Sequence, residues 1–144
     1  MNTKQKGDIA EAQVLAAFLR AGLNVLTPFG DRNRYDCVLE QGGVFKRVQV
    51  KTGRVHKGGI RFNSYSVTSE NGKIKHRSYK GQIDLFAVYS PEFNKIYLIP
   101  VELCHERDTK LSLTGVNRNQ HKAIVAADFE FPSHVAQRKS SVLI

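Results

Sequence analysis

The sequence contains no long apolar run, and its apolar residues occur in groups of only a few. A membrane-spanning helix needs roughly 20 consecutive apolar residues, and a secretory signal peptide needs an apolar segment near the N-terminus. The first residues, MNTKQKGD, instead lead into an amphipathic pattern that contains Glu11. We therefore expect neither a membrane span nor a signal peptide, and we expect a cytoplasmic protein.

Cysteine is scarce, because Cys37 and Cys104 are the only two and lie outside any CxxC spacing. This argues against a disulfide framework and against a zinc site, and favours two buried free thiols. Internal repeats and low-complexity segments are also missing from the sequence. At 144 residues, with 41% apolar content, the chain is large enough for one domain with its own hydrophobic core.

Acidic residues are nearly missing between residues 46 and 80, where ten Lys or Arg accompany Glu70 alone. The other 109 residues carry twelve basic and twelve acidic side chains, so the net charge of +9 is concentrated in this segment. A field of a single sign is typical of a surface that binds a polyanion. We expect duplex or structured nucleic acid as the partner, with a solvated basic surface as the alternative.

The N-terminal third predicts a helix followed by β-structure. Helical periodicity predicts a helix over residues 3–21, and a short strand follows at 24–27 before Pro28. Two β-hairpins are then predicted, with turns at Gln41-Gly42-Gly43 and Glu70-Asn71-Gly72, because these residues reach positive φ at low cost. The predicted hairpin strands are 36–40 and 44–52, then 60–68 and 73–78.

The C-terminal half predicts a buried sheet and a second helix. Dense apolar segments at 83–90 and 95–103 predict two strands in the sheet interior, with Asp84 at the solvent edge of the first. A second helix is predicted over 117–128, and we expect residues 133–144 to form a loosely ordered tail.

The first helix carries a carboxylate close to its apolar stripe. Apolar residues recur as Val14, Leu15, Phe18 and Leu19, and steps of three and four residues back from the first two reach Glu11. A buried carboxylate needs a partner cation, proton or metal. We therefore interpret Glu11 as functional, with an ordinary glutamate on a helix surface as the alternative.

The second strand of the first hairpin has an apolar face and a polar back. Side chains alternate across a strand, so Val48 and Val50 share one face while Gln49 and Lys51 share the other. Asp36 opens the strand before it. Packing alone does not explain an acid, an amide and an ammonium group at these positions.

These residues supply the chemistry of a metal site if the hairpin packs on the helix. Magnesium is usually held by one or two carboxylates together with waters and a substrate phosphate. The candidate ligands are Glu11, Asp36, the side-chain carbonyl of Gln49 and the backbone carbonyl of Val50, with Mg²⁺ as the expected cofactor and Mn²⁺ as a substitute. Lys51 would position or deprotonate the attacking water and stabilise charge in the transition state.

Basic side chains would hold DNA around this centre. The second hairpin exposes Arg61 and Arg77 with Phe62 and Tyr65 interleaved, and a β-ribbon of this width enters a major groove. A solvated hairpin that binds nothing is the alternative. The predicted DNA-binding residues are Arg32, Arg34, Lys46, Arg47, Arg54, Lys57, Arg61, Lys73, Lys75, Arg77 and Lys80.

The order of these residues resembles the PD-(D/E)XK nuclease superfamily, in which the same set is carried by a helix and a hairpin. The chain has Glu11, then Asp36, then Gln49-x-Lys51. More narrowly, the runs GDIAE, VFKRVQVKTG, FAVYSPE and YLIPV are similar to endonucleases of this superfamily encoded in group I introns, over about residues 6–130. The resemblance implies an α/β, restriction-endonuclease-like αβββαβ core with a mixed central sheet and an inserted basic β-hairpin.

Two residues depart from the general pattern. Tyr35 stands before Asp36 where the motif has proline, and Gln49 stands where the motif has Asp or Glu. The amide removes one negative charge, so the attraction for a metal falls, although its carbonyl can still ligate. The intron-encoded branch is similar in carrying Gln here, so we interpret Gln49 as a member of the site; a site without activity is the alternative.

The resemblance implies a metal-dependent DNA endonuclease that hydrolyses phosphodiester bonds at a long specific duplex site, as a homing endonuclease. One active centre cuts one strand, so we expect a homo-oligomer, a dimer at least or a tetramer. The alternatives are a structure-selective nuclease of the archaeal Holliday-junction resolvase type and a catalytically silent DNA-binding module. We expect a nuclease domain at residues 1–132, with a DNA-binding insertion at 53–80.

Overall fold

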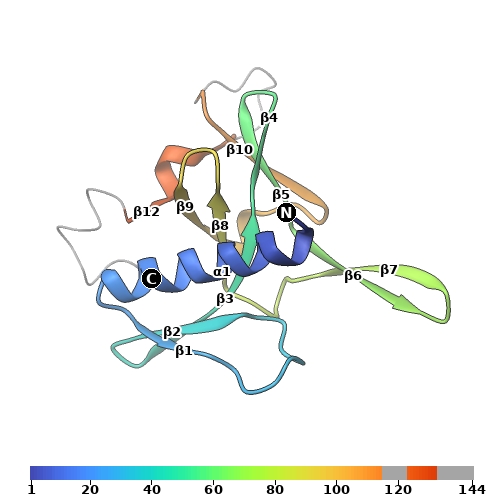
Figure 1. Ribbon diagram of the computed structural model, residues 1–144, viewed down its shortest axis with the longest axis horizontal. Helices are drawn as coiled ribbons and strands as arrows, with labels where there is room; N and C mark the ends of the chain where they lie inside the picture. The colour runs from blue at the N-terminus through green and yellow to red at the C-terminus, as the bar shows by residue number, and fades with distance from the viewer. Residues whose placement is uncertain (115–122, 133–144) are drawn as a thin grey trace.

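A helix and a six-stranded sheet form the centre of the computed structural model, which describes residues 1–114 and 123–132 (Figure 1). Helix α1 (Thr3–Arg20) confirms the predicted first helix, and Asn2 caps it through a capping box with Gln5. The sheet has the order β1-β2-β3-β8-β9-β12. Its strands are β1 (Asn24–Leu26), β2 (Cys37–Gln41), β3 (Val44–Thr52), β8 (Leu85–Ser90), β9 (Lys95–Pro100) and β12 (Glu130–Phe131).

The central sheet is mixed, as the resemblance implied. Strands β3 and β8 are parallel, whereas the other neighbours are antiparallel. Parallel neighbours require a crossover connection, which is usually a helix. Here the crossover consists of residues 53–84 and contains four strands and no α-helix: β4 (Arg54–His56), β5 (Gly59–Asn63), β6 (Tyr65–Glu70) and β7 (Lys73–Ser78).

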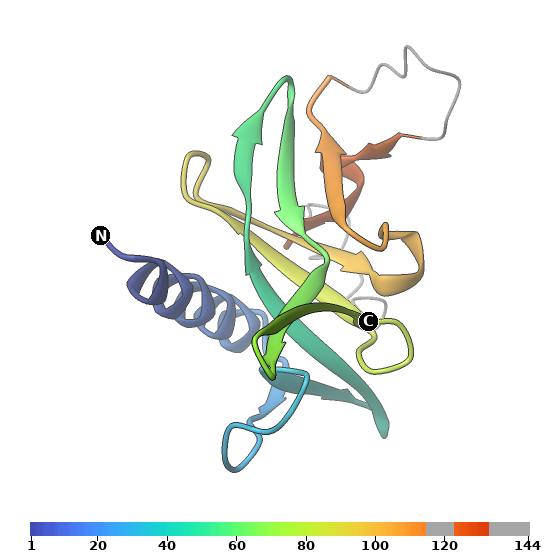
Figure 2. The same cartoon turned by 90° about the vertical axis from the view of Figure 1, so that its right-hand side faces the viewer.

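Each face of the central sheet has its own hydrophobic core. On one face Ala10, Val14 and Phe18 of α1 pack against a cluster that includes Val48 and Val50 of β3. The other face is covered by a second sheet of order β11-β10-β5-β4, as Figure 2 shows. Its further strands are β10 (Asp108–Ser112) and β11 (Ile124–Val125), and 3₁₀ helices η1 (Val101–Leu103) and η2 (Ala126–Phe129) flank them.

The two sheets approach closely at the end of β3, and Gly53 makes this approach possible. A Cβ atom at Gly53 would lie 2.5 Å from Ile60 Cγ2 and 2.9 Å from Val88 Cγ1. The Gly53 amide donates to the Tyr89 carbonyl at 2.8 Å. Glycine therefore lets the chain leave the central sheet for β4 immediately after Lys51 and Thr52.

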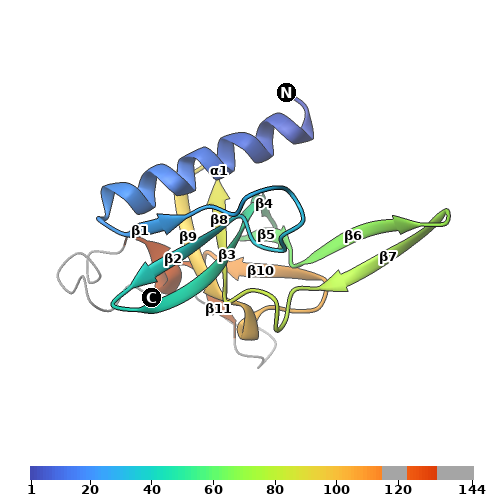
Figure 3. The same cartoon turned by 90° about the horizontal axis from the view of Figure 1, so that it is seen from below.

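Strands β6 and β7 pair only with each other and extend away from the body of the molecule (Figure 3). We call residues 65–78 the arm. Cross-strand pairing runs from Tyr65 opposite Ser78 to Glu70 opposite Lys73, which confirms the predicted turn at 70–72. Asn71 and Gly72 have positive φ values of 52° and 74°, as that turn requires.

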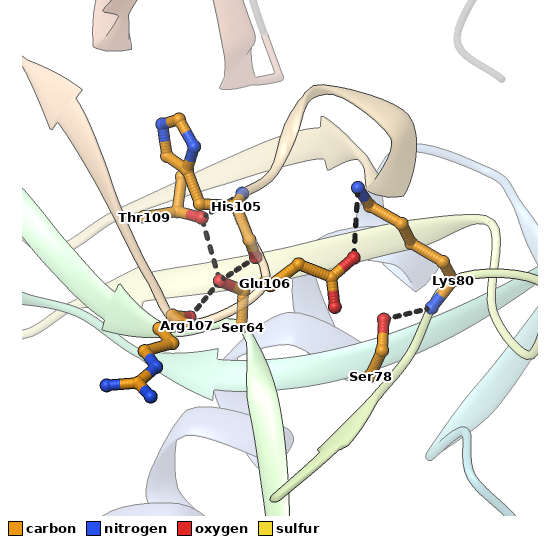
Figure 4. Close-up of polar contacts among 7 residues, drawn as sticks. All are labelled: Ser64, Ser78, Lys80, His105, Glu106, Arg107 and Thr109. Atoms are coloured by element: carbon orange, nitrogen blue, oxygen red, sulfur yellow. Dashed lines mark hydrogen bonds and ion pairs between the residues drawn. The ribbon is translucent and has the colours of Figure 1, made fainter.

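The predicted continuous strand over 60–68 is wrong, because the chain divides at Ser64 into β5 and β6 of different sheets. Ser64 is 3% exposed, and its hydroxyl lies 2.7 Å from the His105 carbonyl and 2.8 Å from Thr109 Oγ1 (Figure 4). The Ser64 amide also donates to the Arg107 carbonyl at 2.8 Å. These bonds turn the chain, so the buried Phe62 lies outside the exposed ribbon in which we predicted it.

The predicted second helix is also wrong where the structure describes it. Residues 117–122 lie outside the described part, whereas 123–128 contain β11 and the start of η2. Strand β11 pairs in parallel with β10, which gives these residues a sheet partner in place of helical hydrogen bonds. The predicted strand over 95–103 ends at Pro100, and η1 follows it. The predicted tail at 133–144 lies outside the described residues.

Both predicted free thiols are present and buried, at Cys37 and Cys104. Across residues 1–114 and 123–132, no helix is long and apolar enough to cross a membrane.

Candidate active site

The site is built around Asp36, which lies where β2 begins against β3. Its amide donates to the Val48 carbonyl at 2.8 Å, and its Oδ2 accepts a hydrogen bond from the Val50 amide at 2.8 Å. The ladder between β2 and β3 starts at the pair Cys37 and Val48, so the Asp36 carboxylate satisfies the first strand amide that β2 does not reach. The carboxylate is therefore fixed against the backbone of β3.

The Val50 carbonyl faces the same strand edge as the Asp36 carboxylate. The N–H and C=O of one strand residue point toward the same neighbour, and the Val50 amide already points to Asp36. The Gln49 side chain lies beside this carbonyl, with Nε2 at 3.4 Å from the Val50 oxygen. The backbone oxygen and the side-chain amide are thus adjacent at one strand edge.

The predicted polar back of β3 is confirmed. Val48 and Val50 are buried in the cluster under α1, while Gln49 and Lys51 are half-buried and alternate with them. Lys51 Nζ donates to the Tyr65 carbonyl at 3.3 Å and lies 5.0 Å from the centre of the Tyr79 ring. The amine is therefore held at the root of the arm.

Burial lowers the pKa of Lys51, the nearby charge of Asp36 opposes this shift, and the positive charge of Arg34 adds to it. Burial also raises the pKa of Asp36, against the opposing effects of the Val50 amide and Lys51. An acid and an amine whose charged forms are both disfavoured by burial are typical of functional sites. Each is within electrostatic reach of the other.

Glu11 approaches Asp36 from helix α1, and its side chain is half-buried at the edge of the apolar stripe. Burial raises the pKa of Glu11, and the negative charges of Asp36 and Asp8 raise it further. The same two carboxylates affect the thiol of Cys37. Burial, followed by the negative charges of Asp36 and Glu11, raises the pKa of this thiol to about 12. The structure thus places Glu11 close enough to Asp36 for their negative charges to repel each other.

The donor chemistry fits a hard divalent cation. Within the part of the chain that the structure describes, no three His, Cys, Asp or Glu side chains gather into a metal-binding group. Two carboxylates, the Val50 carbonyl and the Gln49 side-chain oxygen would nevertheless supply an all-oxygen donor set of the kind that magnesium and manganese accept. A cation between the carboxylates would also offset the repulsion that raises the pKa of Glu11.

The predicted DNA-binding residues separate into two groups by their contacts. Arg47 pairs with Asp84, with Nε 3.1 Å from Oδ2, and Arg34 is hydrogen-bonded at the root of the arm. Asp84 therefore links β3 to the start of β8. It accepts hydrogen bonds from both the side chain of Arg47 and the Arg47 backbone amide, the latter at 2.7 Å. Arg34 and Arg47 thus both have partners within the protein, and their contact with DNA stays a prediction.

The remaining members lie at or near the surface. Three of them have a carboxylate partner: Arg61 with Asp108 at 2.8 Å, Lys75 with Glu70 at 3.1 Å, and Lys80 with Glu106 at 3.3 Å. The others are Arg32, Lys46, Arg54, Lys57, Lys73 and Arg77, and all except the half-buried Lys46 are exposed. On β7 the cations occupy alternate positions, so Lys73, Lys75 and Arg77 share one face of the arm.

Sequence reasoning missed Tyr79 as a neighbour of the site. Its ring is 5% exposed and lies under both Lys51 and the Arg34 guanidinium, which is 4.1 Å from the ring centre. Tyr79 belongs to no motif, and its only signal in the sequence is an aromatic residue within a basic segment. Tyr65, which was predicted only as an aromatic residue of the basic hairpin, also contributes its backbone carbonyl to Lys51.

Comparison with known proteins agrees with this geometry. Residues 1–132 match the PD-(D/E)XK endonuclease family. The solved structure of a bacterial homing endonuclease, I-Ssp6803I, is similar with a TM-score of 0.74 and 25% sequence identity, over 98% of this chain and 97% of that one. Comparison with curated proteins found no match. The chain is therefore a nuclease that belongs to the PD-(D/E)XK endonuclease family.

Proposed function

We propose that this protein is a divalent-metal-dependent homing endonuclease that cuts duplex DNA at a long specific site. The observation that carries the proposal is the Asp36 carboxylate, fixed to the edge of β3 beside the Val50 carbonyl and coupled to both Glu11 and Lys51. The similarity of the whole chain to a homing endonuclease supports the biological class.

The residues divide the chemistry among themselves. Glu11 and Asp36, with the Val50 carbonyl and the Gln49 amide, would hold the cation, which when bound stabilises negative charge on the phosphodiester. Lys51 donates hydrogen bonds toward the phosphate oxygens, and its lowered pKa lets it exchange a proton with the attacking water more readily than an exposed lysine. Tyr65 and Tyr79 keep its amine directed at this position.

The basic segment would supply affinity for the DNA backbone. The face of the arm with Lys73, Lys75 and Arg77 offers three exposed cations in a row, which suits successive phosphates or a groove edge. One centre of this kind hydrolyses one strand, so a double-strand break requires at least two copies of the chain. Two-fold symmetry would then match a near-palindromic target.

A selection of cleaved sites tests this proposal. The purified protein is incubated with a library of randomised linear duplexes and Mg²⁺ or Mn²⁺, and cleaved molecules are sequenced; Asp36→Asn serves as the isosteric control. We expect cleavage at a long recurring site by the wild type and none by the control. A parallel assay offers a four-way junction, and preference for the junction over every duplex would refute the homing proposal. DNA binding without cleavage in either metal would identify a silent DNA-binding module instead.

A further inference from the structure

The arm reaches the rest of the molecule through few polar contacts, and most of those on the side of the active site involve Arg34. An isolated two-stranded hairpin is marginally stable in water and has no fixed direction relative to its body. The arm forms no ladder with either sheet, so its direction depends on the contacts at its root.

The Arg34 guanidinium joins both strands of the arm. Nη1 donates to the Ser66 hydroxyl on β6, while Nη2 donates to the carbonyls of Ser78 at 2.9 Å and Arg77 at 3.5 Å on β7. Nε donates to the Gln82 side chain, just after the arm. One planar group thus occupies four acceptors that come from three separate parts of the crossover, a geometry that a lysine cannot reproduce.

Arg34 is also linked to the proposed catalytic residues, through its backbone to Asp36 and through the Tyr79 ring to Lys51. It lies two residues before Asp36, whose amide and carboxylate are bound to β3. Its guanidinium stacks 4.1 Å from the centre of the Tyr79 ring, the ring that also contacts Lys51. Movement of the arm away from Arg34 would therefore displace Tyr65, whose carbonyl accepts a hydrogen bond from the Lys51 amine, while Tyr79 stays packed in the core.

We propose that Arg34 is a positioning residue that fixes the arm relative to Asp36 and Lys51, so that DNA held on the arm is presented to the active site. The expected effect of Arg34 on DNA cleavage rests on the proposed function, whereas its effect on the direction of the arm does not. Because four of its five N–H groups donate to acceptors within the protein, Arg34 acts through geometry and not as a contact to DNA.

Arg34→Lys separates geometry from charge, because lysine keeps the positive charge and loses the planar fork. We expect the single-turnover cleavage rate at saturating protein to fall about 10- to 100-fold, as for a misplaced catalytic group. The dissociation constant for the same duplex, measured without metal, should change less than about threefold because no phosphate-binding cation is removed. Arg20→Lys is the matched control, since Arg20 is exposed in the last turn of α1; it should leave both quantities unchanged.

Hydrogen exchange gives a readout that does not depend on cleavage. In Arg34→Lys we expect the amides of β6 and β7 to exchange about tenfold faster, while those of β8 keep their protection. Ser66→Ala removes one hydrogen-bond partner of Arg34 and leaves Arg34 in place. We expect it to lower the cleavage rate and speed exchange in β6 and β7 by smaller factors than Arg34→Lys. It replaces Arg34→Lys in the test if that variant does not fold.

Wild-type cleavage by Arg34→Lys, with unchanged exchange in the arm, would overturn the inference. An equal loss of affinity and rate would also overturn it, by making Arg34 a DNA contact. If the wild type cleaves no DNA yet arm exchange rises in the variant, the proposed function fails while the role of Arg34 in fixing the arm stands.

Discussion

Replacing Ser64 by alanine should destabilise the protein by about 2–3 kcal/mol, although the change removes a single oxygen atom. Ser64 lies at the junction of β5 and β6, is buried, and contacts the segment 105–109, which follows η1 and includes the start of β10 (Figure 4). The size of the effect follows from which of the Ser64 and Thr109 hydroxyl groups donates and which accepts each hydrogen bond.

Thr109 Oγ1 accepts a hydrogen bond from the His105 amide at 3.0 Å, so its own hydrogen is free to point at Ser64 Oγ. Ser64 in turn donates to the carbonyl of His105 or Arg107. Alanine removes the donated bond, which contributes about 1 kcal/mol. It also leaves the buried Thr109 hydroxyl with only the sulfur of Cys104, a weak acceptor, in place of the Ser64 oxygen, which costs about 1–2 kcal/mol more. Thr109 is fully buried, so water cannot replace the lost partner.

Urea unfolding followed by circular dichroism measures this difference, and the melting temperature should fall by about 5–10 °C. Ser69→Ala is the matched control, because Ser69 is exposed on the arm and should change stability by less than about 0.5 kcal/mol. The combination of Ser64→Ala with Thr109→Val should be less destabilising than the sum of the two single changes, since both partners are then apolar. A Ser64→Ala effect as small as that of the control would refute the reasoning.

Four further outcomes are expected. Asp36→Asn keeps an oxygen for the Val50 amide, so it should fold and bind DNA normally while its cleavage rate in a plasmid-nicking assay falls at least about 1,000-fold. Glu11→Gln should raise the melting temperature at pH 7. The raised pKa of Glu11 means that its ionised form opposes folding, and the gain should shrink as pH falls through that raised value and vanish below 4.5. Gly53→Ala should cost about 1–3 kcal/mol in urea unfolding, because its Cβ would overlap Ile60. Arg77→Ala should weaken DNA binding and reduce the slope of affinity against salt by about one unit in fluorescence titrations, while a slope equal to the wild type would remove the arm from the interface.

The sequence contained enough information to predict the first hairpin and its polar back. Gly42 and Gly43 have φ values of 58° and 82°, so the turn required residues that reach positive φ cheaply, and these are visible in the sequence. Alternation then places Val48 and Val50 under the helix and Gln49 and Lys51 opposite, which is how the strand is buried. The turn residues and the two-residue alternation of side chains were therefore sufficient to predict the hairpin and the two faces of β3.

Long-range partners account for the predictions that failed. The alternation from Ile60 to Thr68 is continuous, and the break at Ser64 depends on carbonyls of His105 and Arg107, which are about forty residues away. The pairing of Arg47 with Asp84 also depends on the fold and is not visible in the basic segment of the sequence. A charge count cannot distinguish an arginine that is paired inside the protein from one that is available to DNA.

Gln49 is the position at which the site departs from its superfamily, and the electrostatics of its neighbours give that departure a physical sense. Burial already raises the pKa of Asp36, and burial with repulsion raises that of Glu11, so both carboxylates are costly to keep ionised without a cation. A third carboxylate at position 49 would increase this repulsion at neutral pH. An amide beside the Val50 carbonyl retains an oxygen ligand without adding charge, at the expense of weaker attraction for the metal. If the site holds a divalent cation as proposed, Gln49 would balance the stability of the metal-free site against its affinity for that cation.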